Sequence, residues 1–171
     1  LIYHAADGRS HDYPLLAIGK THYDPIETLT LVRTAEDELI LADGYDRWET
    51  YRRYGDSFRL TEIRLRSGAC LRLHYEHQVD ARQVLSDLIT YQDDQVHTQL
   101  GTQLDDAGRI VGLWRIAEGK LDRQLACYDY NEAGDLRRAW DEHGAHWDYH
   151  YRHHLITRYT DRTGRGMNLQ W

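Results

Sequence analysis

Apolar and polar side chains alternate with a period of two along several segments of the chain. Residues 71–76 place leucine and tyrosine in one phase and polar side chains in the other. The same alternation recurs at residues 147–152 and 167–171. A period of two is typical of β-strands that have one buried face and one solvated face. The chain is therefore predicted to be all-β.

One predicted strand contains a break in its alternation. Phe58 and Leu60 share one phase, whereas Ile63 and Leu65 take the other. A single extra residue shifts the phase of a strand in this way. We therefore expect a β-bulge or a strong twist near Glu62.

Three shorter segments are also assigned to strands. Residues 29–32 and 39–41 are short runs of β-type residues. Residues 83–89 place four apolar side chains at helical spacing, so a helix is an alternative there. The segment spans only about two turns of helix, and its neighbours are predicted strands. A strand is therefore favoured for residues 83–89.

Turns of one kind separate the later strands. Residues 105–108, 131–134, 141–144 and 161–164 all have the pattern Asp/Asn-x-x-Gly. Asp or Asn opens a type I turn by a side-chain bond to the backbone, and Gly takes the left-handed position that closes it. Such turns join adjacent antiparallel strands.

Turns and strands together form a repeat of about 20 residues. Asp141 and Asp161 are 20 residues apart, Tyr-x-Tyr recurs after 21 residues, and a leucine recurs after 19. A unit of this length is one β-hairpin, which must stack on neighbours to bury its apolar face. The candidate repeat residues are structural: Tyr128, Asp129, Tyr130, Gly134, Leu136, Asp141, Gly144, Tyr149, Tyr151, Leu155, Asp161 and Gly164.

This pattern resembles the YD repeat of the Rhs (rearrangement hotspot) family. Residues 128–144 resemble one copy, residues 150–165 resemble the next, and residues 106–110 resemble a looser third copy. Residues 39–48 and 57–76 are similar to the segment that leads into the first repeats. The resemblance covers most of the chain from about Pro14 onward, and it divides the chain into a lead-in region (1–100) and repeats (101–171).

The resemblance implies a fold and a function. The implied fold is part of a coiled, hollow shell of antiparallel β-hairpins. The implied function is the encapsulation of a C-terminal toxin in a secreted bacterial polymorphic toxin or type VI secretion effector. The implied partners are the rest of the shell, the toxin and secretion-spike proteins. The chain begins at Leu1, so we expect it to be a piece of a longer protein.

This sequence also departs from the family pattern. Its turns at 141–144 and 161–164 lack the usual proline. The family's core motif, where members cut themselves with an aspartate pair, is not visible. No catalytic residue is therefore carried over, and this segment is expected to be neither an enzyme nor a cofactor-binding protein.

Composition further narrows the functional classes to which the chain can belong. Tyr (13) and Trp (5) supply nearly all the aromatic residues, and both suit half-buried surfaces. The net charge of −7 gives no basic footprint for nucleic acid. No apolar run approaches the roughly 18 residues of a membrane span, and no signal peptide is recognisable. Cys70 and Cys127 have no metal-like spacing, so two free thiols are favoured over a disulfide.

Histidines supply one alternative chemistry. On a helix, His146, His150 and His154 would stack at zinc-binding spacing. On a strand, His146 and His150 would share a face but stand about 13 Å apart, too far for one ion. The alternation of Trp147 with these histidines favours the strand, so no metal site is predicted.

The remaining alternatives concern carboxylates, aromatic rings and a strand edge. The carboxylates lie mostly in turns, and no acid–base pair is indicated.

The Tyr/Trp stripe at Trp147, Tyr149 and Tyr151 is expected to pack between strands, and its alternative is a face for glycan or protein adhesion. The strand at 167–171 would leave an unpaired edge, so the isolated fragment is expected to aggregate, oligomerise or depend on other chains.

Overall fold

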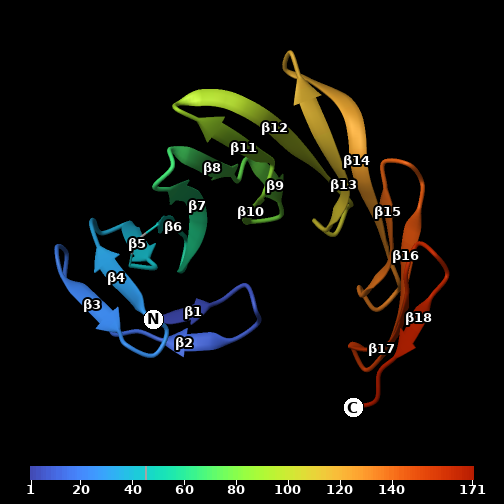
Figure 1. Cartoon of the computed structure of the whole chain (residues 1–171), viewed down its shortest axis with the longest axis horizontal. Helices are drawn as coiled ribbons and strands as arrows, with labels where there is room; N and C mark the ends of the chain where they lie inside the picture. The colour runs from blue at the N-terminus through green and yellow to red at the C-terminus, as the bar shows by residue number, and fades with distance from the viewer. Residues whose placement is uncertain (45) are drawn as a thin grey trace. The chain divides into compact units, whose positions relative to one another are not determined.

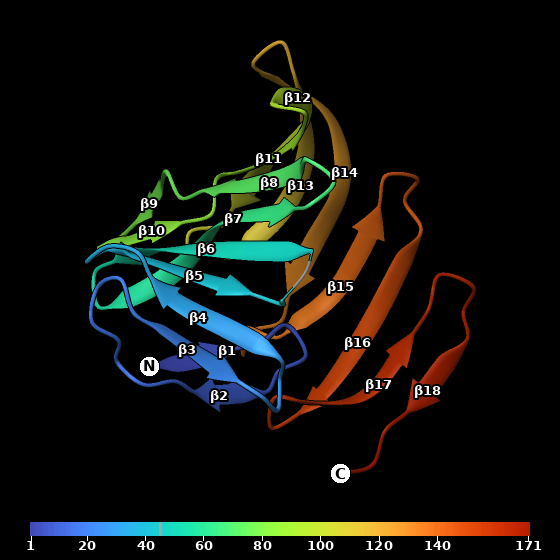
Figure 2. The same cartoon turned by 60° about the vertical axis from the view of Figure 1, so that its left-hand side comes forward.

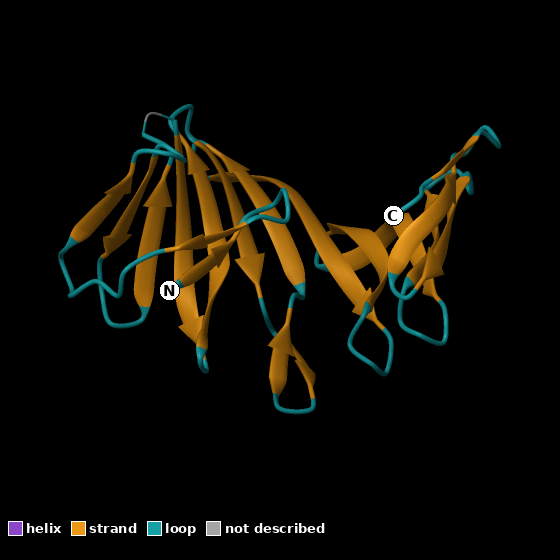
Figure 3. Cartoon of the chain, turned by 90° about the horizontal axis from the view of Figure 1, so that it is seen from below, coloured by secondary structure: helices purple, strands orange, loops and turns teal. Residues whose placement is uncertain are grey.

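The computed structural model of the chain describes residues 1–44 and 46–171. In this part of the chain the structure consists of strands joined by short loops, with no helix (Figure 3). Consequently no helix there has the length and hydropathy to cross a bilayer. The prediction of an all-β chain of antiparallel hairpins is confirmed.

Fourteen strands hydrogen-bond side by side in chain order to form one antiparallel sheet (Figure 1). They are β3 (Thr21–Asp24), β4 (Leu29–Arg33), β5 (Glu38–Ala42), β6 (Arg47–Tyr54), β7 (Ser57–Leu65), β8 (Ala69–His74), β11 (Asp87–Gln92), β12 (Gln95–Leu104), β13 (Ile110–Ala117), β14 (Lys120–Tyr130), β15 (Leu136–Asp141), β16 (His146–Arg152), β17 (Leu155–Thr160) and β18 (Gly166–Asn168). Two further hairpins lie outside this sheet: β1 (Ile2–His4) with β2 (Ser10–Asp12), and β9 (His77–Val79) with β10 (Arg82–Val84).

The chain divides into two compact units. The first consists of Leu1–His74 with Leu88–His97, and the second consists of Tyr75–Asp87 with Thr98–Trp171. Each unit contains one of the small hairpins, β1–β2 in the first and β9–β10 in the second. This division describes compactness only, so the predicted start of the repeats at residue 101 stays a prediction.

The break in alternation on β7 is a β-bulge. Thr50 on β6 pairs with Glu62, and the next residue, Tyr51, pairs with Leu60. Thr61 is therefore the extra residue, and its hydroxyl donates to the Thr50 carbonyl at 3.2 Å. The prediction of a bulge near Glu62 is confirmed.

The first unit contains a small hydrophobic core. Leu31 on β4 and Leu39 and Leu41 on β5 are buried together with Tyr13, which directly follows β2. Tyr3 on β1 packs against the same cluster. The β1–β2 hairpin thus provides a second layer over this part of the sheet, so its apolar face is shielded from water.

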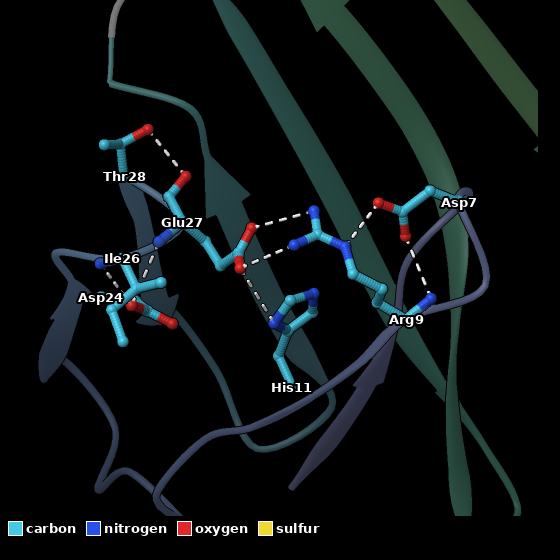
Figure 4. Close-up of polar contacts among 7 residues, drawn as sticks. All are labelled: Asp7, Arg9, His11, Asp24, Ile26, Glu27 and Thr28. Atoms are coloured by element: carbon cyan, nitrogen blue, oxygen red, sulfur yellow. Dashed lines mark hydrogen bonds and ion pairs between the residues drawn. The ribbon is translucent and has the colours of Figure 1, made fainter.

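Ion pairs fasten the same hairpin to the turn between β3 and β4 (Figure 4). Both terminal nitrogens of Arg9 donate to the Glu27 carboxylate, at 3.1 and 3.2 Å. Arg9 Nε donates to Asp7 at 2.7 Å, and His11 Nδ1 lies 3.6 Å from Glu27. The two-point contact fixes the orientation of the arginine, as is usual for guanidinium–carboxylate pairs.

The second unit has no comparable core. Its buried residues in the described chain are Ser86, Gly101, Thr102 and Gly112. No described residue after Gly112 is buried. Strands β15 to β18 lie side by side in one layer of the sheet (Figure 2). These strands are therefore held by contacts within the sheet.

Some predicted strands differ from the observed strands in their bounds. Residues 83–84 and 87–89 lie in strands β10 and β11, so the strand interpretation is confirmed outside residues 85–86. The strand predicted at 71–76 ends at His74, and the one predicted at 167–171 ends at Asn168. Cys70 and Cys127 are both free thiols, as favoured from their spacing.

Two turn glycines offer a matched test of how β9–β10 is held. Gly108 and Gly144 close the same kind of turn, with φ of +76° and +80°. An alanine Cβ at Gly144 would meet nothing within 4 Å, whereas at Gly108 it would lie 3.0 Å from Val79 Cγ1. Gly144→Ala should lower the free energy of unfolding by about 1–2 kcal/mol through left-handed strain alone. Gly108→Ala should cost more, because Val79 must also move.

Urea unfolding followed by circular dichroism compares the two variants. In a Val79→Ala background, Gly108→Ala should lower the free energy of unfolding by about as much as Gly144→Ala does. The smaller side chain at position 79 leaves room for the new methyl group. Equal losses for Gly108→Ala and Gly144→Ala would show that Val79 does not constrain the turn.

Candidate functional site

Each motif turn is organised around one side-chain oxygen. Asp141 Oδ1 accepts the backbone N–H groups of His143 and Ala145, at 2.9 and 3.0 Å. The N–H of Gly144 donates to the Asp141 carbonyl at 3.1 Å, and φ of Gly144 is +80°. The side chain thus satisfies backbone donors that the turn leaves without a strand partner.

The same arrangement recurs in the other predicted turns. Asp161 Oδ1 accepts from the N–H groups of Thr163 and Arg165, at 2.8 and 3.0 Å. Asp105 accepts from its turn at 3.0 and 2.9 Å, and Asn131 accepts the N–H of Asp135 at 2.9 Å. The prediction of Asp/Asn-x-x-Gly turns at all four positions is confirmed.

These hydrogen bonds favour the charged form of the turn carboxylates. The backbone N–H of Arg109 is the largest cause that lowers the pKa of Asp105 below its usual value. For Asp161, the bond from the Thr163 hydroxyl is the largest cause, and its pKa is likewise lowered. Both groups therefore remain acceptors at neutral pH, which makes them poor general acids.

The strand register aligns the two repeats and corrects one correspondence. Tyr130 pairs with Leu136, and Tyr151 pairs with Ile156. The structural counterpart of Leu136 is therefore Ile156, and the predicted match to Leu155 is wrong. Leu155 instead pairs with Arg152 and is 49% exposed. The reason is that the second turn is one residue shorter than the first.

A recurring bulge marks the repeat, and sequence spacing alone did not reveal it. The pairing skips Val111 on β13, Arg137 on β15 and Thr157 on β17, each shortly after a turn at the same end of the sheet. Val111 directly follows the looser third copy at residues 106–110, so a bulge occurs at each of the three copies. Such bulges increase the local twist of a hairpin.

The motif tyrosines share one face of the hairpins. Tyr128 pairs with Ala139, which pairs in turn with Trp147. Tyr149 pairs with Tyr159 on the same face. These aromatic side chains are half-buried, and the hydroxyl of Tyr130 donates to the Ile110 carbonyl at 2.8 Å. No described residue after Gly112 is fully covered, so packing of the stripe between strands stays a prediction.

The opposite face is polar. Arg138 on β15 donates to Asp148 on β16 at 2.5 Å, and its guanidinium lies 5.5 Å from the Trp140 ring centre. His146 Nε2 lies 3.2 Å from the same Asp148. At the nearby bulge Arg137 pairs with the motif residue Asp129. Asp129 and Asp148 are thus each engaged by an arginine.

The histidines of this region lie on a strand and in a tight turn. His146 and His150 belong to β16, which confirms the strand interpretation. His153 and His154 form the β16–β17 turn, with φ of 51° and 65°. Within residues 1–44 and 46–171, no three His, Cys, Asp or Glu side chains are placed to hold one metal ion.

A buried carboxylate in the first unit escaped the sequence analysis. Glu49 on β6 is 8% exposed, accepts a 2.5 Å hydrogen bond from the Tyr51 hydroxyl and pairs with Arg47. Burial is the largest cause that raises the pKa of Tyr51, followed by its bond to Glu49. The available signal in the sequence is that Glu49 lies two residues before Tyr51, on the same face of the strand. Because both carboxylate oxygens of Glu49 are engaged, this residue is better suited to a structural role than to proton transfer.

A hollow also lies in the first unit. It has a volume of about 530 Å³ and is lined by apolar side chains that include Ile63, Leu65 and Leu71. Cys70 borders it, and burial raises the pKa of this thiol above its usual value. A thiol in this state is a weak nucleophile.

Neither known protein families nor curated proteins give a match to this sequence. The interpretation of its function therefore depends on the repeat residues and their geometry.

The turn carboxylate can be tested by a pair of substitutions. Asp141→Ala should lower the free energy of unfolding by about 1–2 kcal/mol, because two backbone N–H groups lose their acceptor. Asp141→Asn should retain most of the stability, since Asn131 fills the same position in the β14–β15 turn. Thermal and urea unfolding measure both variants. If Asn proves as damaging as Ala, the oxygen acceptor is not what holds the turn.

Proposed function

We propose that this chain is a structural wall segment of an Rhs/YD-repeat toxin or type VI secretion effector. In that role its hairpins continue into a coiled, hollow β-shell that encloses a C-terminal toxin. The rest of the shell, the enclosed toxin and secretion-spike proteins would be its partners, and the whole protein would be secreted or translocated from a bacterium. The segment itself would have no catalytic role.

One observation supports this proposal above the others. Hairpins with the same turn, the same bulge and the same aromatic positions follow one another in a continuous antiparallel ladder. A layer of this kind has no core of its own after Gly112. It can therefore be extended by adding hairpins, as repeat proteins are, and backbone pairing makes it a continuous barrier.

The chemistry of the motif residues is consistent with a structural role. Asp141 and Asp161 are used as acceptors within their own turns. Asp129 and Asp148 are paired with arginines. A hydrolytic site needs groups that are free to contact a substrate, and these carboxylates are already occupied.

Limited proteolysis of the complete protein tests encapsulation. Under native conditions the C-terminal toxin should resist a broad-specificity protease that digests it after denaturation. The double substitution Asp141→Ala and Asp161→Ala should loosen the wall and accelerate cleavage of the toxin. The matched pair Asp141→Asn and Asp161→Asn should leave protection intact. Rapid digestion of the C-terminal region in the unaltered protein would refute an enclosing shell.

A binding module for glycans or proteins is the second candidate. It is favoured by the aromatic face, where Trp147, Tyr149 and Tyr159 stay half-exposed on neighbouring strands. Aromatic rings of this kind can pack against sugar rings while their polar atoms remain hydrated.

Titration with soluble oligosaccharides, followed by tryptophan fluorescence, separates the two candidates. A binding module should show a saturable change that Tyr149→Ser weakens at least tenfold, because the substitution removes a contacting ring. Tyr23→Ser, at an exposed site in the first unit, serves as the control. A wall segment should show no saturable change for any oligosaccharide.

A further inference from the structure

We propose that His154 and Asp135 form a pH-sensitive link between two neighbouring hairpin turns, stronger at pH 6 than at pH 8. This link is a property of the hairpins themselves, so it stands independently of the proposed function.

The contact joins two turns at the same end of the sheet. His154 Nδ1 lies 2.7 Å from Asp135 Oδ1, across 19 residues of sequence. The His154 side chain is 70% exposed, whereas the Asp135 side chain is only 12% exposed. The second carboxylate oxygen of Asp135 accepts a hydrogen bond from Asn131 Nδ2 at 3.2 Å. Asp135 is therefore held in place, and His154 reaches toward it.

The turn that contains His154 needs this support. His153 and His154 both have left-handed backbone angles, with φ of 51° and 65°. Two-residue hairpin turns with these angles favour Asn-Gly, because side chains other than those of Gly, Asn and Asp are strained there. In the comparable β13–β14 turn, the second position is Gly119. A strained turn opens readily, so a single contact at its tip influences its order.

Protonation changes the strength of the link. A neutral imidazole can donate one hydrogen bond to a carboxylate, whereas an imidazolium adds a full positive charge to the same bond. Histidine changes charge between about pH 5 and pH 8. The bond from His154 is the largest cause that lowers the pKa of Asp135, so Asp135 is charged throughout this range. Acidification from pH 8 to pH 6 therefore strengthens the link.

The charged and titratable groups around the link do not reverse its strengthening at low pH. On β16, the phenol of Tyr151 is the titratable group within electrostatic reach of Asp135, and burial raises its pKa, so it stays neutral below pH 8. Arg152 precedes the turn, and His153 lies beside His154 within it. Arg152 carries its charge equally at both pH values, so it does not change the direction of the effect.

Hydrogen exchange measured by mass spectrometry tests the link. After correction for intrinsic exchange rates, the amides of residues 153–157 should exchange about two- to fivefold more slowly at pH 6 than at pH 8, the range expected for exposed ion pairs. Asp135→Asn and His154→Asn should each abolish this difference. Asn at 154 tolerates the left-handed backbone, so that turn should still form.

A matched control separates this contact from a general effect of histidine. His143 is 82% exposed and lies 3.6 Å from Glu142, and His143→Gln should leave the pH dependence intact. In the unaltered chain, the carboxyl carbon resonance of Asp135 should also follow the titration of His154. Equal protection at both pH values in the unaltered chain, or an unchanged difference in His154→Asn, would overturn the proposal.

Discussion

The later hairpins depend on hydrogen bonding within one layer. A single sheet cannot bury a core, so its strands must be held in register by backbone pairing, cross-strand side-chain pairs and turns. The Asp/Asn-x-x-Gly turns supply the fixed points, because one side-chain oxygen satisfies the backbone of each turn. A shift of one residue in the strand register would exchange the aromatic and charged faces. The turns prevent such a shift, so they fix which face each side chain occupies.

The first unit solves the same problem by adding a layer. Its β1–β2 hairpin covers Leu31, Leu39 and Leu41, and ion pairs of Arg9 fasten it. In the second unit, β9–β10 contacts the sheet through His77, whose ring lies 3.0 Å from the Thr102 carbonyl, but the strands after Gly112 stay uncovered. Tyrosine and tryptophan suit that situation, since a half-exposed ring with a polar atom costs less in water than Phe or Met would. The unusual aromatic composition thus follows from the single-layer architecture.

Much of this fold could be predicted, and the misses have physical causes. Period-two alternation located most strands, and the phase change between Leu60 and Ile63 located the bulge at Thr61. The match of Leu136 to Leu155 failed because the His153–His154 turn is shorter, a difference that backbone angles reveal and residue spacing hides. The burial of Glu49 was missed although its partners Arg47 and Tyr51 are two residues away on the same strand. The cover over this face comes from a segment distant in sequence, where the Tyr3 ring lies 6.2 Å from the Tyr51 ring. The closure of the sheet into a shell remains a proposal.

The half-buried aromatic face of β14–β17 lies in a single layer, where its neighbouring strands are its cover. Hydroxyl-radical footprinting of this chain measures that directly, with buried Tyr13 (5% exposed) and exposed Tyr23 (57%) as internal references. In a single layer, Trp147, Tyr149 and Tyr159 should react at rates between those two references. Protection of these three side chains equal to that of Tyr13 would contradict it, because a second layer would then have to cover the hairpins.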